Sequence, residues 1–124
     1  GYVHAVSHNI GARYGIPHGL GNALALPHVL EAMQEVAATK MAEIAVHCGL
    51  GEAGEGDAVL AGKLVQRVCE LNREIGIPET TDLIPAADID ELVAAIMTEG
   101  GRYPTPRVLD AGECKAIVER LRAA

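Results

Sequence analysis

Apolar residues recur at helical spacing along this chain, whereas strand-like alternation over four or more residues is hard to find. In the clearest case the steps between apolar positions are four, four, three and four residues, at Leu60, Leu64, Val68, Leu71 and Ile75. This spacing predicts a helix with one buried stripe. We expect Asp57 to cap the start of this helix and Gly76, followed by Pro78, to end it.

The same spacing predicts further helices around residues 41–48, 89–96 and 114–121. Gly49 is expected to end the first of these. Acidic residues three positions apart predict a capping box at the start of each of the other two: Asp88 with Glu91, and Asp110 with Glu113.

The first forty residues contain two further helical stretches, Val3–Tyr14 and Gly19–Met33, separated by Gly15-Ile16-Pro17. Pro17 suits a helix start, and Pro27 is expected to kink or split the second stretch. The fold class predicted from these patterns is an all-α bundle of about six helices. We expect it to form a single domain over residues 1–124.

Composition and charge narrow the classes of function. Three Tyr are the only aromatic residues, so the core is expected to be aliphatic. Ten Lys and Arg against seventeen Asp and Glu give a formal charge of −7, which argues against a nucleic-acid partner. No apolar run approaches the ~20 residues of a membrane span. Cys48, Cys69 and Cys114 lack CxxC spacing and fall on apolar stripes, which favours buried thiols in a reduced, cytoplasmic protein.

Three of the five histidines lie within the first eighteen residues. His4 and His8 are four residues apart and share one helix face, and His18 opens the next helix after a Pro turn. Three imidazoles can therefore converge from two helices, and imidazole suits Zn, Fe, Ni or Cu. Histidines that only cap and pack remain the alternative on this pattern alone. His28 and His47 have no such company and are expected to be hydrogen-bonded or at the surface.

Residues 1–11 and 17–29 together resemble the signature of the iron-containing alcohol dehydrogenases. The family pattern is H-x3-H-x2-G, then P-H-G-x2-N-A, then L-P-x-V, and the fourteen-residue step from His4 to His18 also matches. A looser similarity continues through residues 71–78 and the loop at residues 100–107. The resemblance therefore spans most of the chain.

The resemblance implies a division of labour between two domains. Family members place the active site between an N-terminal nucleotide-binding α/β domain and a C-terminal helical domain. This chain resembles most of the helical domain, and the nucleotide-binding domain is absent from it. The chain also begins at Gly1 without Met and places two histidines in its first eight residues, so we expect upstream sequence.

The resemblance also assigns roles to the histidines. The family holds its metal with one Asp and three His, of which two ligands lie upstream of the signature. The other two match His4 and His18, which are the expected ligands of Fe²⁺ (or Zn²⁺). His8 matches a histidine near the metal and the nicotinamide, and is the expected catalytic and cofactor-contacting residue. Its role is either to relay the substrate proton, since a free imidazole titrates near neutral pH, or to form a polar wall of the pocket.

The function implied is an NAD(P)-dependent, metal-activated alcohol dehydrogenase acting on a small alcohol or aldehyde. NAD(P) would be bound mainly by the missing domain, and the isolated chain is expected to be inactive. Its uncovered cleft face, expected to be apolar, predicts a homo-oligomer. One alternative is a stand-alone helical module that binds a metal or a partner chain without catalysis. Another is the zinc chemistry of dehydroquinate synthase and glycerol dehydrogenase, which share the architecture.

Further expectations concern two glycines, Asn22 and the loop at residues 100–107, as the expected surroundings of the histidines. Gly19 and Gly21 are expected to permit close helix packing. Asn22 is expected either to hydrogen-bond loop backbone near His18 or to have a purely structural role as a cap or in a buried hydrogen bond. The loop at residues 100–107 either brings Arg102, Tyr103 or Arg107 to the substrate or is a solvated basic loop.

Overall fold

The computed structural model of the protein describes residues 1–123, so Ala124, the last residue of the predicted domain, lies outside the described residues. These residues form six α-helices and two 3₁₀ turns, which confirms the all-α fold. The only β pairing among residues 1–123 is an isolated bridge between Thr81 and Arg122. The helices are α1 (Tyr2–Tyr14), α2 (His18–Met33), α3 (Ala38–His47), α4 (Asp57–Glu74), α5 (Ile89–Gly100) and α6 (Ala111–Leu121), and the 3₁₀ turns are η1 (Ala53–Glu55) and η2 (Ala86–Asp88).

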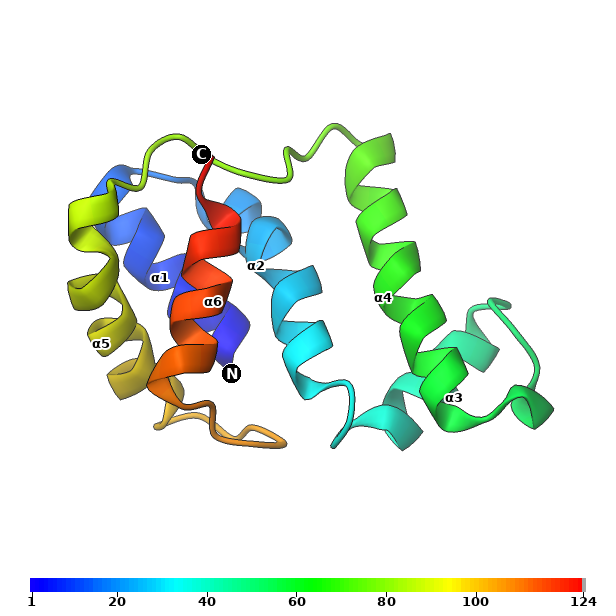
Figure 1. Cartoon of the computed structure of the whole chain (residues 1–124). Helices are drawn as coiled ribbons and strands as arrows, with labels where there is room; N and C mark the ends of the chain where they lie inside the picture. The colour runs from blue at the N-terminus through cyan, green and yellow to red at the C-terminus, as the bar shows by residue number, and fades with distance from the viewer. Residues whose placement is uncertain (124) are drawn as a thin grey trace.

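Two hydrophobic clusters divide the bundle into two parts (Figure 1). The larger cluster fills the space among α1, α2, α5 and α6, and the smaller one lies between α3 and α4. Leu30 and Ala37, near the end of α2, pack on the smaller cluster and join the two parts. The core is aliphatic as predicted, except for Tyr2. The ring of Tyr2 is buried, and its hydroxyl oxygen accepts a hydrogen bond from the Leu109 N–H at 3.0 Å.

Helices α1 and α5 run antiparallel. At one end Tyr14 donates to the Asp88 carboxylate at 3.0 Å and Arg13 pairs with Glu91 at 3.1 Å. At the other end Gly100 packs on the Tyr2 ring so closely that a Cβ there would overlap it. The predicted Asp88–Glu91 capping box is therefore wrong, because both carboxylates pair with side chains of α1 instead.

Of three other predicted helix ends, two are confirmed and one is wrong. The Asp110–Glu113 capping box forms at the start of α6, as expected. Asp57 does not cap α4, because its carboxylate accepts a hydrogen bond from Thr39 at 2.9 Å and the cap position is Gly56. Gly76 ends α4 as predicted, with a φ of 83° that suits glycine.

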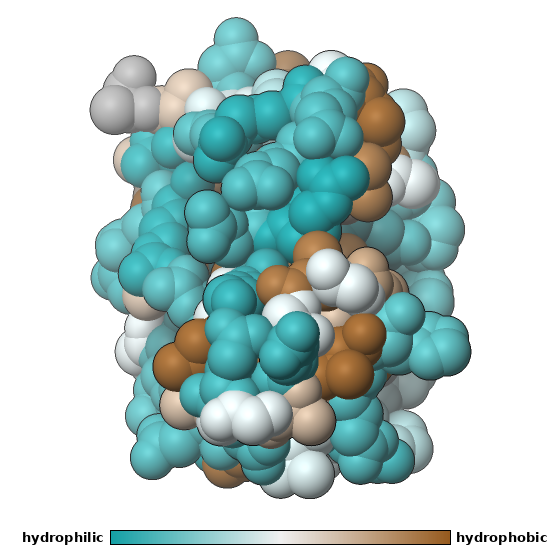
Figure 2. All heavy atoms as spheres, turned by 90° about the vertical axis from the view of Figure 1, so that its right-hand side faces the viewer, coloured by the Kyte–Doolittle hydropathy of each residue, from teal (hydrophilic) through white to brown (hydrophobic). Residues whose placement is uncertain are grey.

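The apolar stripe of α4 is buried only along its first half. Leu60 is 1% exposed, whereas Leu71 is 45% and Ile75 64% exposed. Helix α3 has ten residues against eighteen in α4, so it covers only the beginning of its neighbour. In Figure 2, which faces the α3–α4 side, brown apolar surface lies in patches among hydrophilic residues.

None of the helices within residues 1–123 combines the length and the apolar composition needed to cross a membrane.

Pro27 does not split α2, which runs unbroken from His18 to Met33. A proline lacks the N–H that would bond the carbonyl four residues earlier, so the Ala23 carbonyl loses its helical partner. The side chain of Asn72, on α4, donates a hydrogen bond to this carbonyl at 2.9 Å. The proline therefore leaves a free acceptor in α2 that anchors the neighbouring helix.

The loop between α5 and α6 is fixed by Arg107. Its guanidinium donates to the Glu113 carboxylate at 2.9 Å and to the Ala32 carbonyl, at the end of α2, also at 2.9 Å. The hydrogen bond from Arg107, with a further one from the Asp110 backbone, lowers the pKa of Glu113 to about 2. Arg107 thus holds the loop to α2 and α6, so this part of the loop is not freely solvated.

We expect Asn72→Ala to destabilise the protein by about 1–3 kcal/mol, because the Ala23 carbonyl is left without a partner. In a Pro27→Ala background the same substitution should cost less, since an alanine at this position can supply the missing N–H. Urea unfolding of the four proteins of this double-mutant cycle measures the difference. Equal costs in both backgrounds would contradict this account of the proline.

Glu113→Gln should lower stability at pH 7 and have a smaller effect in acid. The folded state holds the pKa of Glu113 below its ordinary value of 4.5, so the ionised carboxylate contributes stability above about pH 4.5. This contribution is lost as pH falls from about 4.5 towards 2. Urea unfolding at several pH values measures the gap to the wild type, which should narrow across this window. Glu119→Gln, an exposed position of the same helix, is the control and should show no such narrowing.

Candidate metal centre

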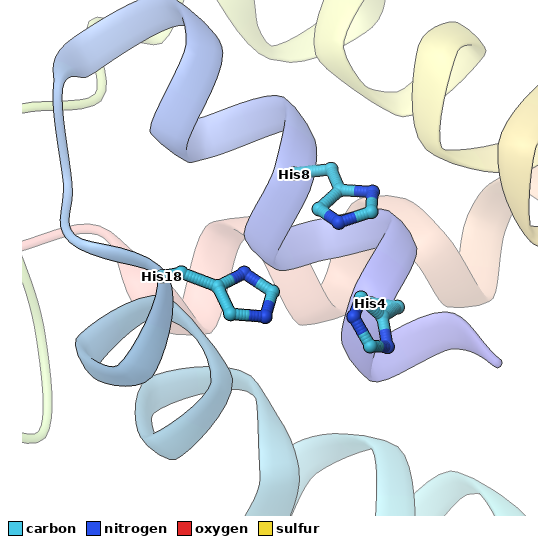
Figure 3. Close-up of side chains that lie close together, drawn as sticks. All are labelled: His4, His8 and His18. Atoms are coloured by element: carbon cyan, nitrogen blue, oxygen red, sulfur yellow. The ribbon is translucent and has the colours of Figure 1, made fainter.

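Side chains of His4, His8 and His18 converge at the junction of α1 and α2 (Figure 3). One potential ligand atom from each lies within 4.8 Å of the others, and all three residues are exposed. The ring centroids are 4.7 Å apart for His4 and His8, 5.0 Å for His4 and His18, and 5.5 Å for His8 and His18. Within residues 1–123 no other three His, Cys, Asp or Glu side chains are so arranged. The predicted convergence of imidazoles from two helices is confirmed.

The turn between the helices brings His18 back towards α1. Gly15 closes α1, Ile16 is buried, and Pro17 is the residue immediately before α2, as the sequence predicted. His18 is therefore the first residue of its helix, while His4 and His8 stand one turn apart on α1.

Ser7 and Gly21 set the distance between the two helices at this point. Ser7 is buried, and its hydroxyl donates to the His18 carbonyl at 3.0 Å. A Cβ at Gly21 would lie 2.6 Å from the Ser7 Oγ and 3.3 Å from the Ser7 Cα, so only glycine allows this approach. The expected role of Gly21 is confirmed. That of Gly19 is wrong, because a Cβ there would meet nothing within 4 Å.

Polar neighbours hold the His18 ring. The Ser7 Oγ lies 3.4 Å from Nδ1, and the Asn22 side-chain amide lies 3.2 Å from Nε2. Asn22 therefore contacts the ring itself, through an exposed contact. It bonds neither loop backbone nor a helix cap, and the contact is not buried, so the expectations for this residue are wrong.

Glu99 reaches the site from α5. Its Oε2 lies 3.2 Å from the Nδ1 of His8. Sequence reasoning missed both Glu99 and Ser7, since neither belongs to the histidine pattern and the acid is 91 positions from His8.

Tyr103, in the loop between α5 and α6, has its ring centroid 6.3 Å from that of His4. The Arg107 guanidinium is bonded to Glu113 and to the Ala32 carbonyl instead of to the histidines. Arg102 is exposed. An apolar face was expected around the histidines, but the large exposed hydrophobic side chains among residues 1–123 all lie outside α1 and α2. They are Val36, Ile44, Val46, Val59, Leu71, Ile75, Leu83 and Val108.

The remaining candidates lie elsewhere. His28 is half-buried and His47 exposed. Burial, helped by the charge of Arg120, lowers the pKa of His28. Cys114 is a core thiol as predicted, and burial raises its pKa to about 11. Cys69 is only half-buried. Cys48 is exposed, against expectation, because it follows the last turn of α3.

The donor set fits a divalent transition metal ion. Imidazoles are ligands that iron, zinc, nickel and copper accept. His4 and His18 come from different helices, and His18 is oriented by polar neighbours, as metal-binding histidines generally are. The residues present can therefore supply part of a metal site.

Comparison with known proteins agrees with this geometry. Residues 1–122 match the model of the Fe-containing alcohol dehydrogenase family, C-terminal. The chain is 34% identical to 1,3-propanediol dehydrogenase of Klebsiella pneumoniae, over 94% of this chain and 31% of that protein. It is 29% identical to 1-propanol dehydrogenase of Citrobacter freundii, over 98% of this chain and 35% of that protein.

Solved structures give the same result. A crystal structure of 1,3-propanediol oxidoreductase superposes with a TM-score of 0.89 at 32% identity, over 98% of this chain and 32% of that one. Alcohol dehydrogenase from Oenococcus oeni superposes with a TM-score of 0.88 at 26% identity. This chain spans about a third of the length of the relatives it matches. From its histidines, its fold and these matches, the chain belongs to the Fe-containing alcohol dehydrogenase family, whose C-terminal part it represents.

Proposed function

We propose that this chain is the helical, metal-binding part of an NAD(P)-dependent alcohol dehydrogenase that interconverts a small alcohol and its aldehyde. The observation that carries the proposal is the convergence of His4, His8 and His18 from two helices. The propanediol and propanol dehydrogenases among its relatives support a small alcohol as the substrate.

His4 and His18 are the residues that would hold Fe²⁺, or Zn²⁺ in its place. A divalent ion so bound supplies Lewis acidity that lowers the pKa of an alcohol hydroxyl. Holding these two ligands in place is the task of Ser7, Gly21 and Asn22, which fix α1 against α2 and orient the His18 ring.

His8 is proposed to take the hydroxyl proton of the alcohol at its Nε2, and to contact the nicotinamide. Its side chain is 43% exposed, so a proton taken up at the ring can pass to solvent. Tyr103, beside His4, is in a position to border the substrate.

Domains and assembly follow from the family. We propose that residues 1–124 act together with a nucleotide-binding domain that binds most of NAD(P), and that the chain alone is inactive. The hydride acceptor NAD(P) is then held mainly by that domain, and the remaining metal ligands come from residues upstream of His4. A cytoplasmic location stays our proposal, and the three free cysteines among residues 1–123 fit a reducing compartment. The homo-oligomer also stays a proposal, although the apolar face expected to drive it is not found around the histidines.

Zn²⁺ titration of the chain, followed by calorimetry, tests the metal site. We expect weak binding that His4→Ala and His18→Ala each reduce by at least the ~10–100-fold typical of disturbed metal sites. His47→Ala, an exposed histidine on α3, is the control and should leave binding unchanged. Equal binding by all four proteins would overturn the assignment of the ligands.

A chimera tests catalysis. The C-terminal third of the Klebsiella propanediol dehydrogenase is replaced by this chain, and formation of reduced nicotinamide cofactor is followed with propane-1,3-diol. We expect activity that His4→Ala and His18→Ala abolish, and none from the chain alone. A chimera that is folded and binds metal but oxidises none of a series of small alcohols would favour the metal-binding module without catalysis.

Gly21→Ala should destabilise the protein by about 1–3 kcal/mol, because its Cβ would press against Ser7 and force α1 away from α2. The same displacement separates His18 from His4, so Zn²⁺ affinity should fall by roughly tenfold. Gly19→Ala is the matched control on the same helix and meets nothing within 4 Å. It should leave both quantities unchanged or raise stability by up to about 1 kcal/mol. A Gly21→Ala protein with normal stability and affinity would contradict the proposed close approach.

A further inference from the structure

Glu99 and His8 face each other across the contact between α5 and α1. The Oε2 of Glu99 lies 3.2 Å from the Nδ1 of His8, and the two side chains are 29% and 43% exposed. The pair joins residues 91 positions apart in the sequence, and neither the histidine signature nor the local helix pattern contains Glu99.

Packing next to Glu99 determines where its carboxylate lies. Gly100, the following residue, lies on the ring of Tyr2 where no larger residue fits. The hydroxyl of Tyr2 is in turn bonded to the Leu109 backbone. The end of α5 therefore lies close to the beginning of α1, and Glu99 projects along α1 to the turn that carries His8.

The surroundings of the carboxylate distinguish this pair from an ordinary surface salt bridge. The Oε2 atom is shielded from solvent and, among residues 1–123, receives no aligned hydrogen bond. A shielded carboxylate oxygen without a donor is costly. The Nδ1 of His8 lies 3.2 Å from this oxygen, so the imidazole is a donor within reach of it.

Accepting this N–H has a consequence for the opposite nitrogen. In a neutral imidazole one nitrogen carries the proton and the other carries the lone pair, and the hydrogen bond made by one sets the state of the other. With the proton on Nδ1, the lone pair is on Nε2. Figure 3 shows this second nitrogen on the side of the ring that faces His4 and His18.

We propose that Glu99 is a positioning residue that accepts the Nδ1–H of His8, fixes the ring, and leaves Nε2 as its basic nitrogen. The inference rests on the proposed function, in which Nε2 takes the proton of the alcohol. Glu99 itself touches neither substrate nor metal. Its role is to select the tautomer in which His8 can act.

Nitrogen-15 NMR of the chain reads the tautomer directly, without metal, cofactor or catalysis. Spectra are recorded at alkaline pH, where imidazole is neutral. The wild type should show a protonated Nδ1 and an unprotonated Nε2 for His8. Glu99→Leu should shift His8 towards the Nε2–H tautomer, and Glu99→Gln should restore the wild-type pattern, because its amide oxygen can accept the same N–H. Glu119→Leu, exposed on α6, is the matched control and should leave His8 unchanged.

A wild-type His8 with its proton on Nε2 would overturn the proposal, even if Glu99→Leu failed to fold. The same tautomer in the wild type and in a folded Glu99→Leu protein would also overturn it. Failure of the proposed function gives a different pair of results. The His8 tautomer would then still change in Glu99→Leu, while His4→Ala and His18→Ala left Zn²⁺ affinity unchanged. If Zn²⁺ affinity depended on His4 and His18 but the His8 tautomer did not change in Glu99→Leu, only the positioning role of Glu99 would be rejected.

Discussion

The close approach of α1 to α2 at Ser7 and Gly21 is the constraint on which the site depends. With no Cβ at Gly21, the Ser7 hydroxyl reaches the His18 carbonyl, and a buried polar group receives a partner in the same contact. The first residue of α2 is thereby held opposite the face of α1 that carries His4 and His8. A metal site made of side chains from two helices needs such a fixed separation, because imidazole ligands cannot stretch to follow a moving backbone.

The sequence predicted each of the six α-helices, because helical periodicity is a local signal, but it predicted neither of the two 3₁₀ turns and only some of the helix ends. Asp110 and Glu113 form their capping box at the start of α6, and Glu113 does so while its carboxylate also accepts a hydrogen bond from Arg107, six residues away. Asp88 and Asp57 stand in equally favourable positions, yet their carboxylates are taken by Tyr14 and Thr39. Those partners come from other helices, 74 and 18 residues away. A capping pattern therefore shows what a side chain can do, and tertiary contacts decide what it does.

The candidate site divides in the same way. The three histidines were predictable because they lie within fifteen residues, where one turn of helix and one Pro turn fix their arrangement. Glu99 was not, since seventeen acidic residues are equivalent until the α1–α5 contact selects one of them. Cys48 failed for a related reason. It continues the apolar stripe of α3 in sequence, but the helix ends at His47 and the stripe ends with it.

Helix α2 links the site to the rest of the molecule through its backbone carbonyls. The His18 carbonyl binds Ser7 of α1, the Ala23 carbonyl binds Asn72 of α4, and the Ala32 carbonyl binds Arg107 of the loop that carries Tyr103. Pro27 frees the second of these acceptors, and the last lies in the final turn of the helix, where carbonyls have no intrahelical partner. A helix whose carbonyls were all used internally would hold its neighbours by apolar contact alone, which fixes orientation less sharply than a directional hydrogen bond. The proline inside α2 therefore helps to fix α4 against the helix that carries His18.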